Sequence, residues 1–277
     1  MPSTGDKALW MATAVCHKTV SSLREEFTTE IGGQSLRFSF YQREGWVKCY
    51  QLHAGERVAG YGAVVVAGPW RCRPAIFEFY VVPNERTHTF ALFEALLEAH
   101  SSPLGVATQT NAPLLPLMLH VYCTNVATES VVFEDANSNA RVAPPAPCEI
   151  RQLTSAADTA AALSARRGSC DFEVVTADGQ VVATGGIGFH YNPVAEGLHP
   201  FGDIYYEVVP GKRRQGWASY LAVALKSACY ALGSVPTARC NSDNHASRRT
   251  LQRAGFVPVA LAQEGTLAND AVIHSKL

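Results

Sequence analysis

Apolar and polar positions alternate in the same order in both halves of the chain, and this pattern predicts the same elements twice. In the first half, residues 46–68 have the pattern of a strand, a turn and a strand, and residues 75–100 that of a strand, a loop and an amphipathic helix. In the second half, residues 170–191 repeat the hairpin and residues 203–232 repeat the strand, loop and helix. The sequence therefore indicates an internal repeat.

Two further features support the repeat. Val-Val-Pro ends the strand before the loop in each half, at Val81–Pro83 and at Val208–Pro210. After each long helix comes another strand, within residues 104–111 and 237–244, and then a further helix. We expect two related units of mixed α/β class, each a sheet flanked by helices.

A proline-rich segment lies between the two halves. "RVAPPAPCEI", residues 141–150, has three prolines within four positions, which favours an extended linker over a helix or a central strand. This predicts a first domain over residues 1–140, a linker over 141–149 and a second domain over 150–277.

Composition narrows the function classes. The 277 residues are 47% hydrophobic and carry a net charge of −1, which disfavours a protein whose main partner is DNA or RNA. The 8 cysteines are scattered and no HExxH or zinc-type spacing occurs, so we expect reduced thiols and no metal site. No apolar run is long enough to span a membrane, and we expect a soluble, cytoplasmic protein.

The loop after the second Val-Val-Pro has the chemistry of an anion site. It enters a helix whose first N–H groups lack intrahelical partners and whose dipole is positive at this end. Gly216 permits close approach of a ligand to the backbone, and Lys212, Arg213 and Arg214 add positive charge. These features predict a pyrophosphate cradle; the alternative is a solvated basic turn before a surface helix.

Two motifs in this half resemble the GNAT acetyltransferase superfamily. Arg213-x-x-Gly216-x-Ala218 fits its Arg/Gln-x-x-Gly-x-Gly/Ala signature, and "NHASRRTLQRAGF", residues 244–256, is similar to its second motif. The second motif and "DIYYEVVP" look most like the branch that acetylates the N-termini of ribosomal proteins. The resemblance covers about residues 171–259. It implies two tandem GNAT-like domains, each with a mixed, mostly antiparallel sheet.

The resemblance also implies a site for acetyl-coenzyme A or another acyl-coenzyme A. The strand at Tyr206 and Val208 would pair with the pantetheine amides, and an N–H near Val208 would polarise the thioester carbonyl. Asn244 would bond the pantetheine arm, with a plain helix N-cap as the other reading. The pyrophosphate would lie on the loop and first helical turn, formed by Arg213, Arg214, Gln215, Gly216, Trp217, Ala218 and Ser219.

The catalytic residues common in relatives are absent here. Leu251 stands where many carry a tyrosine acid, and Arg239 where a glutamate base often lies. Ser247 is the nearest substitute donor, or a small helix residue without a role. Asp203 and Glu207 share a strand face and are the candidate bases, although Glu207 could instead pair with a nearby arginine. Tyr205, on the same face, would shape the acceptor pocket or belong to the core.

The first half departs from the family pattern. Its corresponding loop, "RTHTF" at residues 86–90, lacks the glycine, and Leu114 stands where Ser247 stands in the second half. We expect a degenerate copy that does not bind coenzyme A and serves as scaffold or as a wall of the acceptor pocket. Residues 108–111, "TQTN", would face the acceptor or cap the next helix.

The leading hypothesis is an N-acyltransferase that moves an acyl group, acetyl first of all, from coenzyme A to the amine of a small molecule or peptide. The amine would attack the thioester directly in a ternary complex. One alternative is a GNAT-fold transferase that takes its acyl group from aminoacyl-tRNA, which would need a basic surface. Another is a protein that binds acyl-coenzyme A without turnover.

Overall fold

The computed structural model describes residues 10–100, 105–165, 168–189 and 201–268. The chain forms two compact units, one of residues 1–129 with 261–277 and the other of residues 130–260. In this division the expected linker, residues 141–149, lies inside the second unit. No helix in the described ranges is long and apolar enough to cross a membrane.

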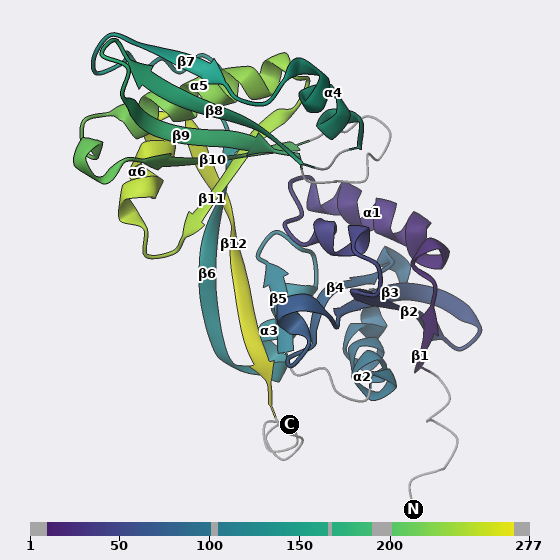
Figure 1. Ribbon diagram of the computed structural model, residues 1–277. Helices are drawn as coiled ribbons and strands as arrows, with labels where there is room; N and C mark the ends of the chain where they lie inside the picture. Colours follow the sequence, from purple (N-terminus) through teal and green to yellow (C-terminus); the bar gives the residue numbers. More distant parts are fainter. Residues whose placement is uncertain (1–9, 101–104, 166–167, 190–200, 269–277) are drawn as a thin grey trace, which may run out of the picture. The chain divides into compact units, whose positions relative to one another are not determined.

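The first unit is a mixed sheet with helices on both faces (Figure 1). Its strand order is β1-β2-β3-β4-β5-β12-β6, and β4 and β5 are the parallel pair among antiparallel neighbours. The elements within residues 10–122 are β1 (Trp10–Val15), η2 (His17–Val20), α1 (Ser21–Ile31), η3 (Phe38–Gln42), β2 (Val47–Ala54), β3 (Arg57–Val65), η4 (Gly68–Trp70), β4 (Ala75–Val81), η5 (Pro83–His88), α2 (Thr89–Ala99), β5 (Gly105–Gln109) and α3 (Leu115–Tyr122).

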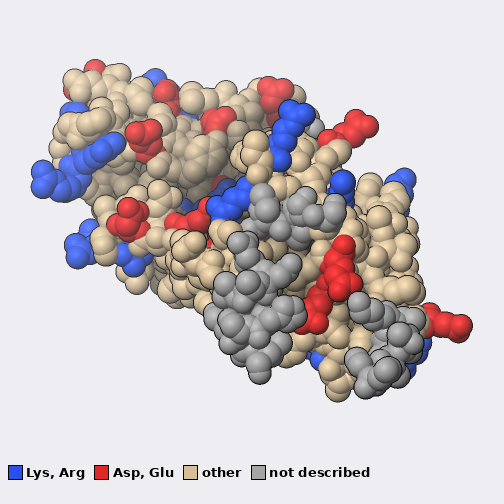
Figure 2. Space-filling view, turned by 90° about the horizontal axis from the view of Figure 1, so that it is seen from below, with Lys and Arg blue, Asp and Glu red and all other residues tan. Residues whose placement is uncertain are grey.

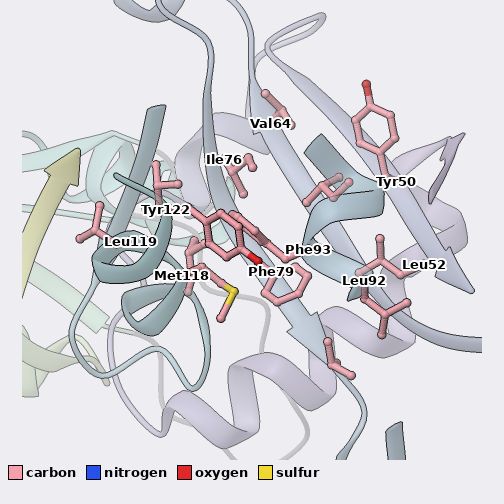
Figure 3. Close-up of a cluster of buried hydrophobic side chains, with 14 of the residues drawn as sticks. Tyr50, Leu52, Val64, Ile76, Phe79, Leu92, Phe93, Met118, Leu119 and Tyr122 are labelled. Atoms are coloured by element: carbon pink, nitrogen blue, oxygen red, sulfur yellow. The ribbon is translucent and has the colours of Figure 1, made fainter. Parts of the chain in front are cut away.

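Both faces of this first sheet are covered by apolar side chains. One cluster joins Leu52 and Phe79 of the sheet to Phe93 of α2 and Met118 of α3 (Figure 3). A second cluster joins the alternate strand positions, such as Tyr61, to residues of α1 and η3. Because side chains alternate along a strand, the two clusters lie on opposite faces, and the sheet is buried on both.

The second unit repeats this architecture. Its strand order is β7-β8-β9-β10-β11-β6-β12, with β10 and β11 as the parallel pair. The hairpin, strand, loop and helix expected from the sequence are present, and the predicted mixed α/β class is confirmed. The elements after residue 147 are β7 (Cys148–Gln152), α4 (Ala156–Ala165), β8 (Ser169–Thr176), β9 (Val181–Gly188), β10 (Phe201–Val208), η6 (Pro210–Lys212), α5 (Trp217–Ala231), β11 (Val235–Asn241), α6 (His245–Arg253) and β12 (Phe256–Leu267).

Two long strands each serve both units. β6 (Cys123–Asp135) pairs through residues 130–134 with β11 in the second unit, while residues 123–129 belong to the first. β12 begins in the second unit and pairs through residues 262–266 with β5 in the first. The two strands are neighbours in the strand order and run side by side in Figure 1. Each half of the sequence thus supplies one strand to the other half's sheet.

The two faces of the second sheet differ in chemistry. On one face α5 packs against β9, β10 and β11, and that face is apolar. The opposite face, here called the polar face, carries alternate residues of β8 to β11, as the strand registers require. Its polar residues and glycines include Ser169, Asp171, Glu173, Thr184, Gly186, Gly188, Asp203, Tyr205, Glu207, Thr237 and Arg239.

Candidate functional site

The parallel strands of the second unit separate before β10 ends. β10 pairs with β11 only from Phe201 to Ile204, but it pairs with β9 as far as Val208. Val209 N–H donates to the Val182 carbonyl on β9 (3.1 Å), so the alternation of the ladder turns the backbone groups of Tyr206 and Val208 away from β9. The structure thus places both predicted residues on the open side, where β11 has diverged.

The loop that follows has an unusual backbone. Arg214 (φ 63°) and Gly216 (φ 100°) both lie in the left-handed region, which a residue with a Cβ rarely adopts. α5 begins directly afterwards at Trp217, and no side chain caps its N-terminus. Left-handed residues before a helix start turn successive N–H groups toward one concavity, which is the geometry of an anion-binding nest.

The side chains around the loop differ in burial. Residues 213–216 are exposed, whereas Trp217 and Ser219 are buried and anchor the first turn of α5. Arg213 Nε donates to the Val208 carbonyl (3.0 Å), which ties the loop back to the strand end. Ala218 is half-buried. Gln215 contacts its own loop, with Nε2 donating to the Gly211 carbonyl (3.4 Å) and Oε1 accepting from Trp217 Nε1 (3.4 Å).

The start of α6 lies on the same face of the sheet as α5. Asn244 Oδ1 accepts from Ser247 N–H (3.0 Å), so Asn244 is the N-cap of α6. Ser247 Oγ lies 3.0 Å from the phenol oxygen of Tyr206 on β10. Burial raises the pKa of Tyr206 to about 12, so its phenol stays protonated at neutral pH. Leu251 is buried one turn further along.

The two candidate bases each face an arginine. Asp203 is buried and its Oδ2 lies 3.3 Å from Arg239 Nε. Glu207 is exposed, and its Oε1 lies 3.6 Å from an Nη of Arg213. Both carboxylates lie on the polar face together with Tyr205, as the expected alternation requires. The arginine pair that the sequence left open as an alternative for Glu207 is therefore present, and Asp203 has an arginine partner that was not expected.

Sequence reasoning did not single out Asp171. Tyr205 O–H donates to Asp171 Oδ1, and Ser169 Oγ donates to Asp171 Oδ2 (3.2 Å). Burial and the bond to Asp171 raise the pKa of Tyr205, so it remains a donor. The registers of three strands place Asp171 and Tyr205 on either side of Gly186. The only signal in the sequence was that Asp171 is a polar residue at an alternate position of a predicted strand. That pattern does not show that its partner is Tyr205.

The corresponding loop of the first unit has opposite chemistry. Arg86 Nε donates to the Val81 carbonyl (3.2 Å), which matches the bond from Arg213 to Val208. However, a buried carboxylate, Glu85, lies in the loop, and its partner is an Nη of Arg57 at 3.2 Å. The loop therefore has a paired carboxylate where the second unit has Lys212, and it lacks a glycine.

The end of β5 in the first unit is bonded to its own chain. Gln109 Oε1 accepts from Leu36 N–H (2.7 Å), and its Nε2 donates to the Gln34 carbonyl (2.9 Å). Arg37 donates to the Thr108 carbonyl (3.1 Å). Thr108 and Gln109, two of the residues 108–111 expected to face an acceptor or to cap a helix, hold the segment between α1 and η3.

Charge on the surface is mixed. On the face shown in Figure 2, Lys and Arg side chains lie among Asp and Glu side chains and large uncharged areas. Within the described ranges no group of three or more His, Cys, Asp or Glu residues could hold a metal ion.

Comparisons with known proteins point to one family. Residues 126–257 match the model of the acetyltransferase (GNAT) domain. The fold is similar to that of a GNAT-family acetyltransferase from Colwellia psychrerythraea, with a TM-score of 0.68 and 13% identity over 93% of this chain and 99% of that one. No curated protein matches the chain.

Two further solved structures have the same fold. One is a tandem GNAT protein from the clavulanic acid biosynthesis pathway (TM-score 0.59, 12% identity, 94% of this chain and 99% of that one). The other is a GCN5-related N-acetyltransferase from Sphaerobacter thermophilus (TM-score 0.56, 16% identity, 94% and 96%). At these identities the likeness concerns the fold.

Proposed function

From the premise that residues 126–257 form a GNAT acetyltransferase domain, we propose that the protein transfers an acyl group, acetyl first of all, from coenzyme A to an amine. The amine attacks the thioester directly within a ternary complex. The observation that carries the proposal is the nest at the start of α5, where two left-handed residues precede an uncapped, exposed helix N-terminus.

In this proposal the coenzyme and the acceptor bind on opposite faces of the second sheet. The coenzyme lies on the side of α5 and α6, with its pyrophosphate on the N–H groups of residues 214–219. Its pantetheine follows the backbone of Tyr206 and Val208, which the diverging β11 leaves accessible. The acceptor approaches from the polar face. The Val208 N–H is turned toward the opening and stabilises the oxyanion that forms on the thioester carbonyl.

The proposed reaction has no strong general acid or base, and it does not require one. A thiol with a pKa of about 8.5 leaves as the thiolate near neutral pH at a modest cost, so general-acid help adds speed without being essential. Ser247 and its partner Tyr206 are the donors nearest to the opening, on the coenzyme side. Glu207 is exposed and its ion pair with Arg213 is long, so the pair opens readily to solvent. Glu207 then receives the amine's proton directly or through water. Asp203 is buried against Arg239 and stays in its ion pair.

The first unit serves as scaffold in this proposal. Its loop carries Glu85 in place of a cationic residue, and the end of its β5 is bonded to Gln34 and Leu36. A diphosphate would find no glycine in that loop, and the pantetheine would meet the protein's own chain.

The test compares two glycines of one loop. Gly216→Ala places a Cβ at φ 100°, 3.4 Å from Pro145 Cγ, whereas Gly211→Ala meets nothing within 4 Å and needs no special φ. We expect Gly216→Ala to weaken coenzyme A binding in calorimetry by about tenfold or more, because charge-assisted N–H bonds are lost, and Gly211→Ala to leave it unchanged. Thermal unfolding checks that both variants are folded. Equal affinities would overturn the proposed coenzyme site.

Thiol release on a panel of amines then separates transfer from binding alone. Coenzyme A binding together with release supports the transferase. Binding without release on any amine would leave an acyl-coenzyme A-binding protein in its place.

A further inference from the structure

The carboxylates of the polar face differ in how their charge is balanced. Three of them have an arginine partner: Glu173 with Arg151 (3.9 Å), Asp203 with Arg239 (3.3 Å) and Glu207 with Arg213 (3.6 Å). Asp171 does not; among the described residues its side-chain partners are the hydroxyls of Tyr205 and Ser169. This face therefore has one negative charge without a counter-ion from the described chain.

A glycine lies between Asp171 and Tyr205 on the sheet. An alanine at Gly186 would place its Cβ 2.4 Å from the Tyr205 hydroxyl and 2.7 Å from Asp171 Oδ1, so these two side chains would have to shift if position 186 carried a Cβ. Tyr205 is 46% exposed as a residue, although it carries a large aromatic group on a sheet. A carboxylate beside an accessible aromatic ring over a glycine floor is a favourable site for an organic cation.

The first unit holds such a cation from its own chain. There Glu78 is buried with Tyr41 and Tyr61, which both donate to it, and Arg24 Nε lies 3.4 Å from Glu78 Oε2. The Arg24 guanidinium carbon lies 3.4 Å from the centre of the Tyr41 ring. The second unit presents the same combination, a carboxylate and a tyrosine on the sheet, and the described residues supply no cation for it.

We propose that Asp171 and Tyr205 bind a positively charged group of the acceptor, which makes the acceptor a primary amine that carries a second cationic group. The inference rests on the proposed acyl transfer, because it assigns the polar face to the acceptor. Asp171 accepts hydrogen bonds from the bound ammonium, and the Tyr205 ring packs against it.

The bound cation is not the nitrogen that reacts. A carboxylate stabilises the charged form of an amine and raises its pKa, which removes the lone pair needed for attack. The other nitrogen, beyond the reach of Asp171, attacks as the free amine. Its bond to the acyl carbon forms while the carbon–sulfur bond breaks, the sulfur leaves as the thiolate, and the proton lost from nitrogen passes to Glu207 or to water.

The first experiment measures binding without turnover. Calorimetry compares 1,4-diaminobutane with 4-amino-1-butanol, which has one amine and a hydroxyl in place of the second. We expect the diamine to bind at least about tenfold more tightly to the unmodified protein, and Asp171→Asn to abolish this preference. Tyr205→Phe keeps the ring and should reduce the preference less. Equal affinities for the two ligands, or no binding of either, would overturn the inference.

A matched control distinguishes binding at Asp171 from the effect of the overall negative charge of the polar face. Glu173→Gln removes the same charge from the same strand and face, two residues away, but from a carboxylate with an arginine partner. It should preserve the preference for the diamine within about threefold, since a charge at the surface acts weakly at a distance. A loss as large as that in Asp171→Asn would show that only the overall charge matters and would contradict the assigned site.

Failure of this inference is distinguishable from failure of the proposed function. Thiol release from acyl-coenzyme A with 4-amino-1-butanol as good as with the diamine, in the presence of coenzyme binding, would refute the cation site and leave the transferase intact. Absence of coenzyme A binding would refute the transferase, while the calorimetric comparison of the two amines would still decide whether the Asp171 site exists.

Discussion

At the scale of single residues, some features of the candidate site can be predicted from the sequence pattern. Others become visible only from the backbone conformation and the strand register. Gly216 and the cationic loop were predictable, because a glycine before a helix has a simple steric meaning. The left-handed conformation of Arg214 was not, since nothing about an arginine favours φ 63°. Asp171 escaped prediction because its partner, Tyr205, is two strands away.

The Tyr206–Ser247 pair gives a residue-scale prediction. If the pair donates a hydrogen bond to the leaving sulfur, Tyr206→Phe should lower kcat by about 10- to 100-fold and Ser247→Ala by less, while coenzyme A affinity changes little. Since burial raises the pKa of Tyr206 to about 12, the donor is protonated at lower pH, and kcat should not fall between pH 7 and 9 through loss of this proton.

Steady-state kinetics across this pH range test the prediction, with Tyr122→Phe as the control. Tyr122 is a buried tyrosine of the first unit that donates to Glu94. An unchanged kcat in Tyr206→Phe would exclude the pair from the reaction.

At the scale of elements, local patterns predicted most of the second unit. The hairpin of β8 and β9 and the strand–loop–helix of β10 and α5 follow from alternation and from the signals around Gly216, and the predicted resemblance to the GNAT superfamily is confirmed. The finer resemblance to the ribosomal-protein branch stays a prediction. The exchange of β6 and β12 was not foreseeable, because a strand pattern shows that a strand exists and not which strand it pairs with.

A buried lysine holds α5 to the incoming strand and gives a prediction for this element. Lys226 Nζ donates to Asp135 Oδ1 at the end of β6 (3.0 Å) and to the carbonyls of Asn137 and Ala254 (2.6 Å each). Both side chains of the ion pair are 1% exposed. Lys226→Met would leave Asp135 buried without its cation, and we expect a loss of about 3–5 kcal/mol in the free energy of unfolding.

Chemical denaturation measures this loss, with Lys48→Met as a control at an exposed lysine. The double variant Lys226→Met with Asp135→Leu removes both charges and should recover much of the loss. A single variant as stable as the unmodified protein would mean that the pair contributes nothing to the attachment of α5.

At the scale of the whole molecule, the proline-rich segment and the change of unit lie at different places in the chain. The prolines near Pro145 mark an extended segment, and Ala177 N–H donates to the Pro147 carbonyl within the second unit. The change of unit comes earlier, at residues 129–130 inside β6, and again at 260–261 inside β12. Composition marks where a chain cannot form regular structure, but a strand that serves two sheets looks uniform in sequence.

The shared strands make the first unit depend on the far end of the chain. Residues 262–266 of β12 pair with β5 and lie between β5 and β6 in the strand order, and Ala262 is buried. Truncation after Ala260 would leave β5 without this neighbour and expose its apolar residues to water. We therefore expect amide hydrogen exchange in residues 105–109 to accelerate by orders of magnitude, toward the rate of an unprotected chain.

Truncation after Ala268 is the matched control, because it keeps all of β12 and the bond from Ala268 N–H to the Tyr122 carbonyl (2.9 Å). Mass spectrometry of exchange in both truncated chains checks the expectation. The same experiment also measures exchange in the second unit, whose part of β12 ends at residue 260 and is therefore kept in both truncated chains. We expect residues 235–241 of β11 to stay protected longer than β5. Equal protection of β5 in the two truncated chains would show that the first unit holds its sheet without the strand from the second half.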